Sequence, residues 1–111
     1  MITRTAIFEG RIKPGYEQAF FRQIEERLAP LWWRFPKVMD VRMYKIDQVD
    51  EGAPPIIMIQ QVDYPDMDAL AAVMTSPERD QARALTLEIL QMFEGRFYHL
   101  VSEGNGQVPR P

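Results

Sequence analysis

The first part of the chain changes from an alternating pattern to a helical one. In residues 3–12, even and odd positions carry different kinds of side chain: Ala6, Phe8 and Ile12 share one face, and the mostly polar odd positions share the other. The stretch is also rich in β-branched residues, so it predicts a strand that ends at Lys13-Pro14-Gly15. Residues 16–29 then predict a helix, because apolar side chains recur at steps of three or four. This apolar stripe consists of Tyr16, Phe20, Ile24, Leu28 and Leu31.

Pro30 interrupts the helical pattern. Proline lacks a backbone N–H and its ring clashes with the preceding turn, so we expect the helix to break or kink there. Residues 31–35 continue as a short helical turn until Pro36.

The middle of the chain predicts a hairpin and then two helices. Residues 38–49 and 56–63 are expected to be the second and third strands, joined by a loop at 50–55. A helix follows Asp66, whose carboxylate suits the positive end of a helix. Ser76 is a good N-cap and Pro77 a good first helical residue, so another helix should start there.

The last helix, strand and tail follow from the remaining pattern. Helical spacing continues to Phe93, and Gly95 is expected to stop the helix. Residues 96–102 predict the fourth strand. Residues 103–111 contain glycine and proline and little to bury, so we expect a flexible tail behind a single domain at residues 1–102.

The order of elements predicts an α+β, ferredoxin-like fold. Strand, helix, strand, strand, helix, strand is the βαββαβ arrangement of a four-stranded antiparallel sheet with two helices on one face. A strand with one wet face should alternate cleanly, but residues 56–59 are apolar at every position. We therefore expect a second copy to cover the other face, giving a homodimer through the sheet faces.

Composition excludes several functional classes. The net charge of −3, without any basic block, argues against nucleic acid or an anionic membrane as a partner. No apolar stretch approaches the roughly 20 residues of a membrane span, and no signal sequence is recognisable, so a cytoplasmic protein is expected. With no cysteine and one histidine among 111 residues, we expect neither a metal site nor a cofactor.

Three short motifs resemble those of EthD-like proteins in the dimeric α+β-barrel superfamily. They are Ala29-Pro30-Leu31 with Phe35-Pro36, the run at residues 64–70, and Ser76-Pro77-Glu78. The likeness spans about residues 2–102. It implies a barrel of two ferredoxin-like subunits, each with a small-molecule pocket between its sheet and its helices.

The resemblance also implies a class of chemistry. Relatives include cofactor-independent monooxygenases on aromatic polyketides, muconolactone isomerases and polyketide cyclases, so a hydrophobic or aromatic metabolite is the expected ligand. Many EthD-like sequences carry a histidine just ahead of the Ala-Pro-Leu stretch, where this chain has Leu28. That departure leaves His99, on the last strand, as the candidate acid or base.

His99 and two tyrosines are the candidates for chemistry at neutral pH. His99 could act as a general base or donate a hydrogen bond to a ligand, or it could be satisfied by a neighbour or at the dimer interface. Tyr98 points to the opposite face of the strand and takes over the role if that face meets the helices. The phenol of Tyr44 could hold an enolate oxygen, or could simply reach solvent.

Arginines, tryptophans and a methionine are the candidates for ligand binding. Arg4, Arg42 and Arg96 lie in strands, where each must pair with an acid such as Glu9 or Asp40 or bind an anion. Neighbouring helical positions diverge by about 100°, so one of Trp32 and Trp33 faces the core and the other points outward, to a pocket mouth or an interface. Met58 could line an adaptable pocket or be ordinary core.

The sequence is compatible with three functional hypotheses. The protein could be an enzyme, a non-catalytic carrier with the same pocket, or a dimerisation module whose pocket is filled. A cavity with a titratable wall favours the first, a cavity without one favours the second, and the absence of a cavity favours the third. Asp63, Asp66 and Asp68 are explained as a strand end and helix caps, so they do not indicate a metal.

Overall fold

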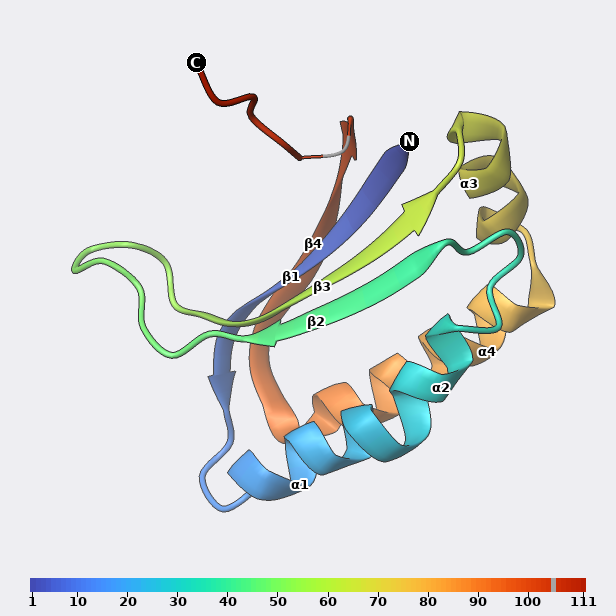
Figure 1. The fold of residues 1–111 in the computed structure, drawn as a ribbon. Coiled ribbons are helices and arrows are strands. Elements are labelled where there is room, and N and C mark those ends of the chain that lie inside the picture. The colour runs from blue at the N-terminus through green and yellow to red at the C-terminus, as the bar shows by residue number, and fades with distance from the viewer. Residues whose placement is uncertain (105) are drawn as a thin grey trace.

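Four strands form one antiparallel sheet in the computed structural model, which describes residues 1–104 and 106–111. The helices of the described chain cover one face of this sheet, and the other face is open (Figure 1). The predicted α+β, ferredoxin-like fold is confirmed. The strands lie in the order β2-β3-β1-β4 and are β1 (Ile2–Ile12), β2 (Asp40–Lys45), β3 (Ile56–Tyr64) and β4 (Phe93–Glu103).

The helical layer is built from two stretches of chain. The first contains α1 (Glu17–Gln23), the π-helix η1 (Ile24–Leu28) and α2 (Ala29–Trp32). The second contains α3 (Met67–Met74), α4 (Pro77–Ile89) and the 3₁₀ turn η2 (Leu90–Met92). Within residues 1–104 and 106–111, no helix combines the length and the apolar character that crossing a membrane would require.

Pro30 changes the type of helix and does not end it. The backbone N–H of Ala29 donates to the carbonyl of Ile24, five residues earlier, which is the hydrogen bond of a π-helix. This wider turn accommodates the proline ring, which would clash with a regular α-helical turn. The helical path therefore continues into α2, and the expected break is a one-turn widening.

The two predicted helix starts are confirmed. The Asp66 carboxylate accepts a hydrogen bond from the backbone N–H of Ala69 at 2.8 Å. The Ser76 hydroxyl accepts one from the N–H of Arg79 at 3.1 Å, and Pro77 is the first residue of α4. Each cap satisfies a donor that the helix itself cannot pair.

The predicted bounds of the second strand (38–49) and of the fourth strand (96–102) are wrong. The second strand spans only Asp40–Lys45, not residues 38–49. Gly95 does not stop a helix, because α4 ends at Ile89 and β4 already starts at Phe93. At the far end β4 continues to Glu103, and the N–H of Gly104 donates to the carbonyl of Met1 at 3.0 Å. Asn105, in the expected tail, lies outside the described residues.

Gly10 and Gly95 bring β1 and β4 into unusually close contact. They face each other in the register, with φ angles of +147° and +146°. A Cβ atom on Gly10 would overlap the carbonyl oxygen of Glu94, and one on Gly95 would overlap that of Glu9. Only glycine fits both positions, because both the space and the backbone conformation exclude a side chain. The ring of Phe93 fills the space beside Gly10.

The core lies between the sheet and the helices and is strongly aromatic. Phe8 stacks on Phe97 with ring centroids 5.5 Å apart, and Phe20 stacks on Phe93 at 6.0 Å. Phe8 and Phe93 also meet edge to face at 6.5 Å. These contacts fix β1, β4 and α1 relative to one another.

We predict that Gly95→Ala destabilises the protein by about 2–4 kcal/mol, because it adds both backbone strain and a steric overlap with β1. Gly52→Ala is the matched control. Gly52 also has a positive φ but has open space around it, so its loss should be about 1 kcal/mol. Urea unfolding of both variants measures the difference. Equal losses would show that the close contact between the strands does not matter.

Candidate functional site

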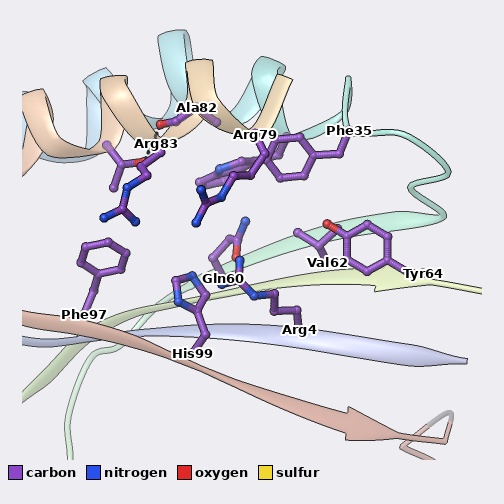
Figure 2. A pocket seen from close by; sticks show the side chains of 12 residues that line it. Arg4, Phe35, Gln60, Val62, Tyr64, Arg79, Ala82, Arg83, Phe97 and His99 are labelled. Carbon is purple, nitrogen blue, oxygen red and sulfur yellow. Dashed lines mark hydrogen bonds between the residues drawn. The ribbon is translucent and has the colours of Figure 1, made fainter. Parts of the chain in front are cut away.

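A cavity of about 70 Å³ lies between α4 and the sheet (Figure 2). The sheet contributes Arg4 from β1, Gln60, Val62 and Tyr64 from β3, and Phe97 and His99 from β4. The helical layer contributes Trp32 at the end of α2, Phe35 in the turn that follows, and Arg79, Ala82, Arg83 and Thr86 from α4. The wall thus combines aromatic rings with polar and charged groups.

Strand alternation places the polar groups of the sheet on the helix side. Ala6 of β1 is opposite both Gln60 of β3 and His99 of β4, so these three side chains share a face. Arg4, two residues before Ala6, lies on the same face. The four side chains come from three neighbouring strands, and those of Arg4, Gln60 and His99 extend toward α4 (Figure 2).

His99 is on the side of β4 that meets the helices. Its ring lies edge-on to Phe97, with centroids 5.6 Å apart, while its position on an edge strand keeps it in contact with solvent. Partial burial lowers the pKa of His99 to about 4, and the positive charges of Arg4, Arg79 and Arg83 add to this effect. His99 is therefore neutral at pH 7, with one ring nitrogen free to accept a proton.

Gln60 and Tyr64 are buried polar residues without a protein partner. Their exposed fractions are 7% and 1%, and no side-chain hydrogen bond of either is found within the described residues. No fully buried side-chain nitrogen or oxygen atom there lacks a partner, so the polar atoms of both residues face the open space of the cavity. The Tyr64 hydroxyl points into the cavity (Figure 2). Burial raises the pKa of Tyr64 to about 12, so its hydroxyl keeps its proton and can donate. The cavity therefore offers an amide and a phenol to a guest.

Tyr98 lies on the opposite face of β4 and does not reach the cavity. It is half-buried, and the Arg96 guanidinium lies 5.0 Å above its ring centroid. Arg96 is held by Glu9, with 2.9 Å between Nε and the carboxylate. The geometry thus places His99, and not Tyr98, at this cavity.

Arg42 also lies on the open face of the sheet, outside the cavity. Its guanidinium binds both oxygens of the Asp63 carboxylate, at 2.6 and 3.0 Å, and one oxygen of Asp40 at 2.9 Å. Thr3 donates a further hydrogen bond to Asp63 at 2.7 Å. The Arg42 contact lowers the pKa of Asp63, and the same pairing raises that of Arg42. Pairing with acids, not ligand binding, explains Arg42.

The remaining candidates divide between the cavity, the core and the surface. Trp32 is buried and lines the cavity, whereas its neighbour Trp33 is 54% exposed and does not. Met58 is fully buried in the core and also does not line the cavity. Tyr44 is 50% exposed on the open face of the sheet. Trp33, Met58 and Tyr44 are thus placed away from the site that they were expected to form.

The cavity residues that were missed in the sequence include Gln60, Tyr64, Arg79 and Arg83, although signals for these four existed. Gln60 and Tyr64 share the parity of the buried Met58, so strict alternation from Met58 puts them on the helix side. Arg79 and Arg83 are four residues apart on one helix, a spacing that places two side chains on one face. They resembled an ordinary solvated helix surface because nothing in the sequence shows that this face meets His99.

The described residues contain no group of three or more His, Cys, Asp or Glu side chains that could hold a metal ion. The donors at the cavity are the neutral imidazole, the amide, the phenol and three guanidiniums. Such a set suits the oxygen atoms of an organic molecule.

Comparison with known proteins supports the fold and not a specific activity. No family model matches the chain, and no curated protein matches it. An EthD family protein from Bacillus halodurans C-125 has a similar structure, with a TM-score of 0.72 and 20% identity, covering 95% of this chain and 99% of that one. The resemblance to EthD-like proteins is thus confirmed at the level of the fold.

Two further structures extend this likeness. A dimeric protein of unknown function and ferredoxin-like fold from Bacteroides fragilis matches with a TM-score of 0.66 and 12% identity, over 93% of this chain and 95% of that one. An antibiotic biosynthesis monooxygenase matches with a TM-score of 0.62 and 16% identity, over 98% and 100%.

We predict that His99 makes the stability of the protein fall as the pH drops from about 6.5 to about 4. Unfolded histidine binds a proton near pH 6.5, whereas folded His99 binds one only near pH 4, so acid favours the unfolded state in this window. Because solvent screens His99, the effect should be about 1 kcal/mol or less. Thermal unfolding of the native chain and of His99→Gln at pH 7 and pH 5 measures it.

The carboxylates titrate equally in both proteins, so His99→Gln should lose less stability than the native chain on acidification. Identical losses would mean that His99 titrates as it does in water.

Proposed function

We propose that this chain is a dimeric α+β-barrel protein that binds a small hydrophobic or aromatic molecule in the cavity between α4 and the sheet, without a metal or prosthetic group. One observation carries the proposal: the amide of Gln60, the phenol of Tyr64 and the imidazole of His99 open onto an aromatic-walled cavity and make no side-chain hydrogen bond among the described residues. No fully buried side-chain nitrogen or oxygen atom of the described residues lacks a partner, so these polar groups are open to the cavity, where a guest can form the hydrogen bonds that the protein leaves unmade.

The wall of the cavity suits an aromatic guest with oxygen atoms. Trp32, Phe35 and Phe97 provide flat apolar surface. The Gln60 amide and the Tyr64 phenol can bind a carbonyl or hydroxyl oxygen of the guest. Water molecules could form hydrogen bonds with the polar groups, but the three aromatic rings would then stay exposed to water.

The neutral His99 supports proton transfer on the bound molecule. Its free ring nitrogen can take a proton from the guest, and the imidazolium can return that proton to another atom. Isomerisation and cyclisation need such a step. The antibiotic biosynthesis monooxygenase among the structural neighbours supports the wider choice of an isomerase, cyclase or cofactor-independent monooxygenase. A carrier would use the same cavity without the transfer.

The open face of the sheet supports a homodimer. Tyr44, Ile59, Ile7 and Tyr98 are cross-strand neighbours and form one apolar row over all four strands. Apolar side chains in a continuous row on an open sheet favour burial against a second copy. Structural neighbours described as dimeric support this arrangement.

We predict that Ala82→Leu abolishes ligand binding by filling the cavity, because Ala82 lies in its wall. Ala84→Leu, on the exposed side of the same helix, is the matched control and should bind normally. A panel of small aromatic compounds, titrated calorimetrically into the native chain, identifies ligands for the comparison. Equal binding by both variants would place the ligand elsewhere.

The same ligands test the chemical role of His99. If the protein turns a ligand over, His99→Ala should remove turnover while Tyr98→Phe leaves it unchanged, because Tyr98 lies outside the cavity. Binding without turnover in the native chain would identify the carrier alternative.

We predict that Ile59→Asp converts the homodimer into a monomer, because it places a charge in the middle of the apolar row. A standard interface buries about 800 Å² per subunit, and one uncompensated buried charge suffices to oppose it. Leu87→Asp, at an exposed position of α4, is the control. Light scattering of the two variants and the native chain gives their masses. A native chain with the 13.0 kDa mass of a monomer would reject the dimer.

A further inference from the structure

Three guanidinium groups surround the cavity. Arg4 reaches it from β1, and Arg79 and Arg83 reach it from neighbouring turns of α4 (Figure 2). Helix and sheet therefore direct positive charge toward the same small space. Figure 2 shows the side chains of Arg79 and Arg83 extending toward the sheet, above His99 and Arg4.

These charges have almost no compensation from the protein. No carboxylate lines the cavity in the part of the chain that the structure describes. Within the same residues, Arg4 and Arg83 make no ion pair, and Arg79 makes only a 3.8 Å contact with the exposed Asp80. The arginines on the open face differ: Arg42 is bound by Asp63 and Asp40, and Arg96 by Glu9.

Arg4 is the most informative of the three. It is half-buried on the sheet, and both burial and the nearby charge of Arg79 lower its pKa. A half-buried guanidinium without an acid, next to another guanidinium, is unfavourable unless an anion joins them. Replacing Arg4 by an apolar residue would remove this cost, so its presence indicates a role in binding.

We propose, building on the function proposed above, that the ligand of this cavity is an aromatic oxyanion whose charged group binds between Arg4, Arg79 and Arg83. The planar fork of a guanidinium matches the oxygens of a carboxylate or a phosphate, and both groups share this chemistry. Gln60 and Tyr64, more than nine-tenths buried and without protein partners, supply further donors to the oxygens. The aromatic body then lies against Trp32, Phe35 and Phe97.

An anionic ligand also changes what His99 can do. The charged or titratable groups that share the cavity with it are Arg4, Arg79, Arg83 and Tyr64. A bound oxyanion offsets the three positive charges, so it makes the imidazolium easier to form. The ligand would thus strengthen the base that acts on it, and His99 would stay a weak base in the empty site.

The test uses Trp32 as a reporter. The chain has two tryptophans, and Trp33 is exposed, so Trp33→Phe leaves one indole, in the cavity wall. In this background, fluorescence titrations compare benzoate, phenyl phosphate and the neutral benzamide at constant ionic strength, because single-ring probes suit the small cavity and do not emit in the range of tryptophan. We expect at least one anion to bind about tenfold or more tightly than the amide.

Arginine variants assign that preference to the site. Arg4→Gln and Arg83→Gln should each weaken binding of the anion about tenfold more than they weaken binding of the amide. Arg22→Gln, on the exposed side of α1, removes the same charge away from the cavity and should have no effect. Circular dichroism checks that each variant is folded, and the exposed Arg83 provides a test if Arg4→Gln is not.

The outcomes separate the two proposals. If the amide binds as tightly as the anions and the arginine variants change nothing, the oxyanion inference is overturned while small-molecule binding stands. If no probe binds to the folded protein, both proposals are contradicted. A preference for phosphate over carboxylate, lost in Arg83→Gln, supports the inference and identifies the charged group.

Discussion

The arrangement of this protein depends on one constraint, the two-residue alternation of a sheet that is covered on one face only. Ala6 is paired with Gln60 on one neighbouring strand and with His99 on the other, and this register determines which side chains face the helices. A slip of one residue would exchange the cavity wall for the residues of the open face. The close contact of Gly10 with Gly95 pins this register, because side chains at any other pairing would collide there.

The two faces of the sheet differ in whether their arginines are paired with carboxylates. On the open face, arginines and acids are matched, as in the contact of Arg42 with Asp63. On the covered face, Arg4 meets other guanidiniums and no carboxylate within the described residues. Pairing on the open face fits a surface that a second subunit covers. Unpaired charge on the covered face fits a site that a ligand completes.

Patterning along the chain predicted the fold well, because strand alternation, helical spacing and the caps at Asp66 and Ser76 are local signals. It failed where the cause lies far away in sequence: Gly95 resembled a helix stop, but its conformation is set by Gly10 on another strand. The residues of the site were harder to predict than the fold. His99 could be identified from the sequence because it is the one side chain with an ordinary pKa near neutrality. Arg79 could be assigned to the site only from the fold, which places α4 over the sheet.

In the proposed site, partial burial and, to a lesser extent, the surrounding guanidiniums keep His99 neutral, and a ligand anion offsets the charge of those guanidiniums. Because His99 is the sole histidine of the chain, its ring signals in an NMR pH titration need no assignment by mutation. We predict a pKa well below the ordinary value of about 6.5 in the free protein, and a rise toward that value when benzoate is bound. A pKa near 6.5 that does not respond to the bound anion would contradict it.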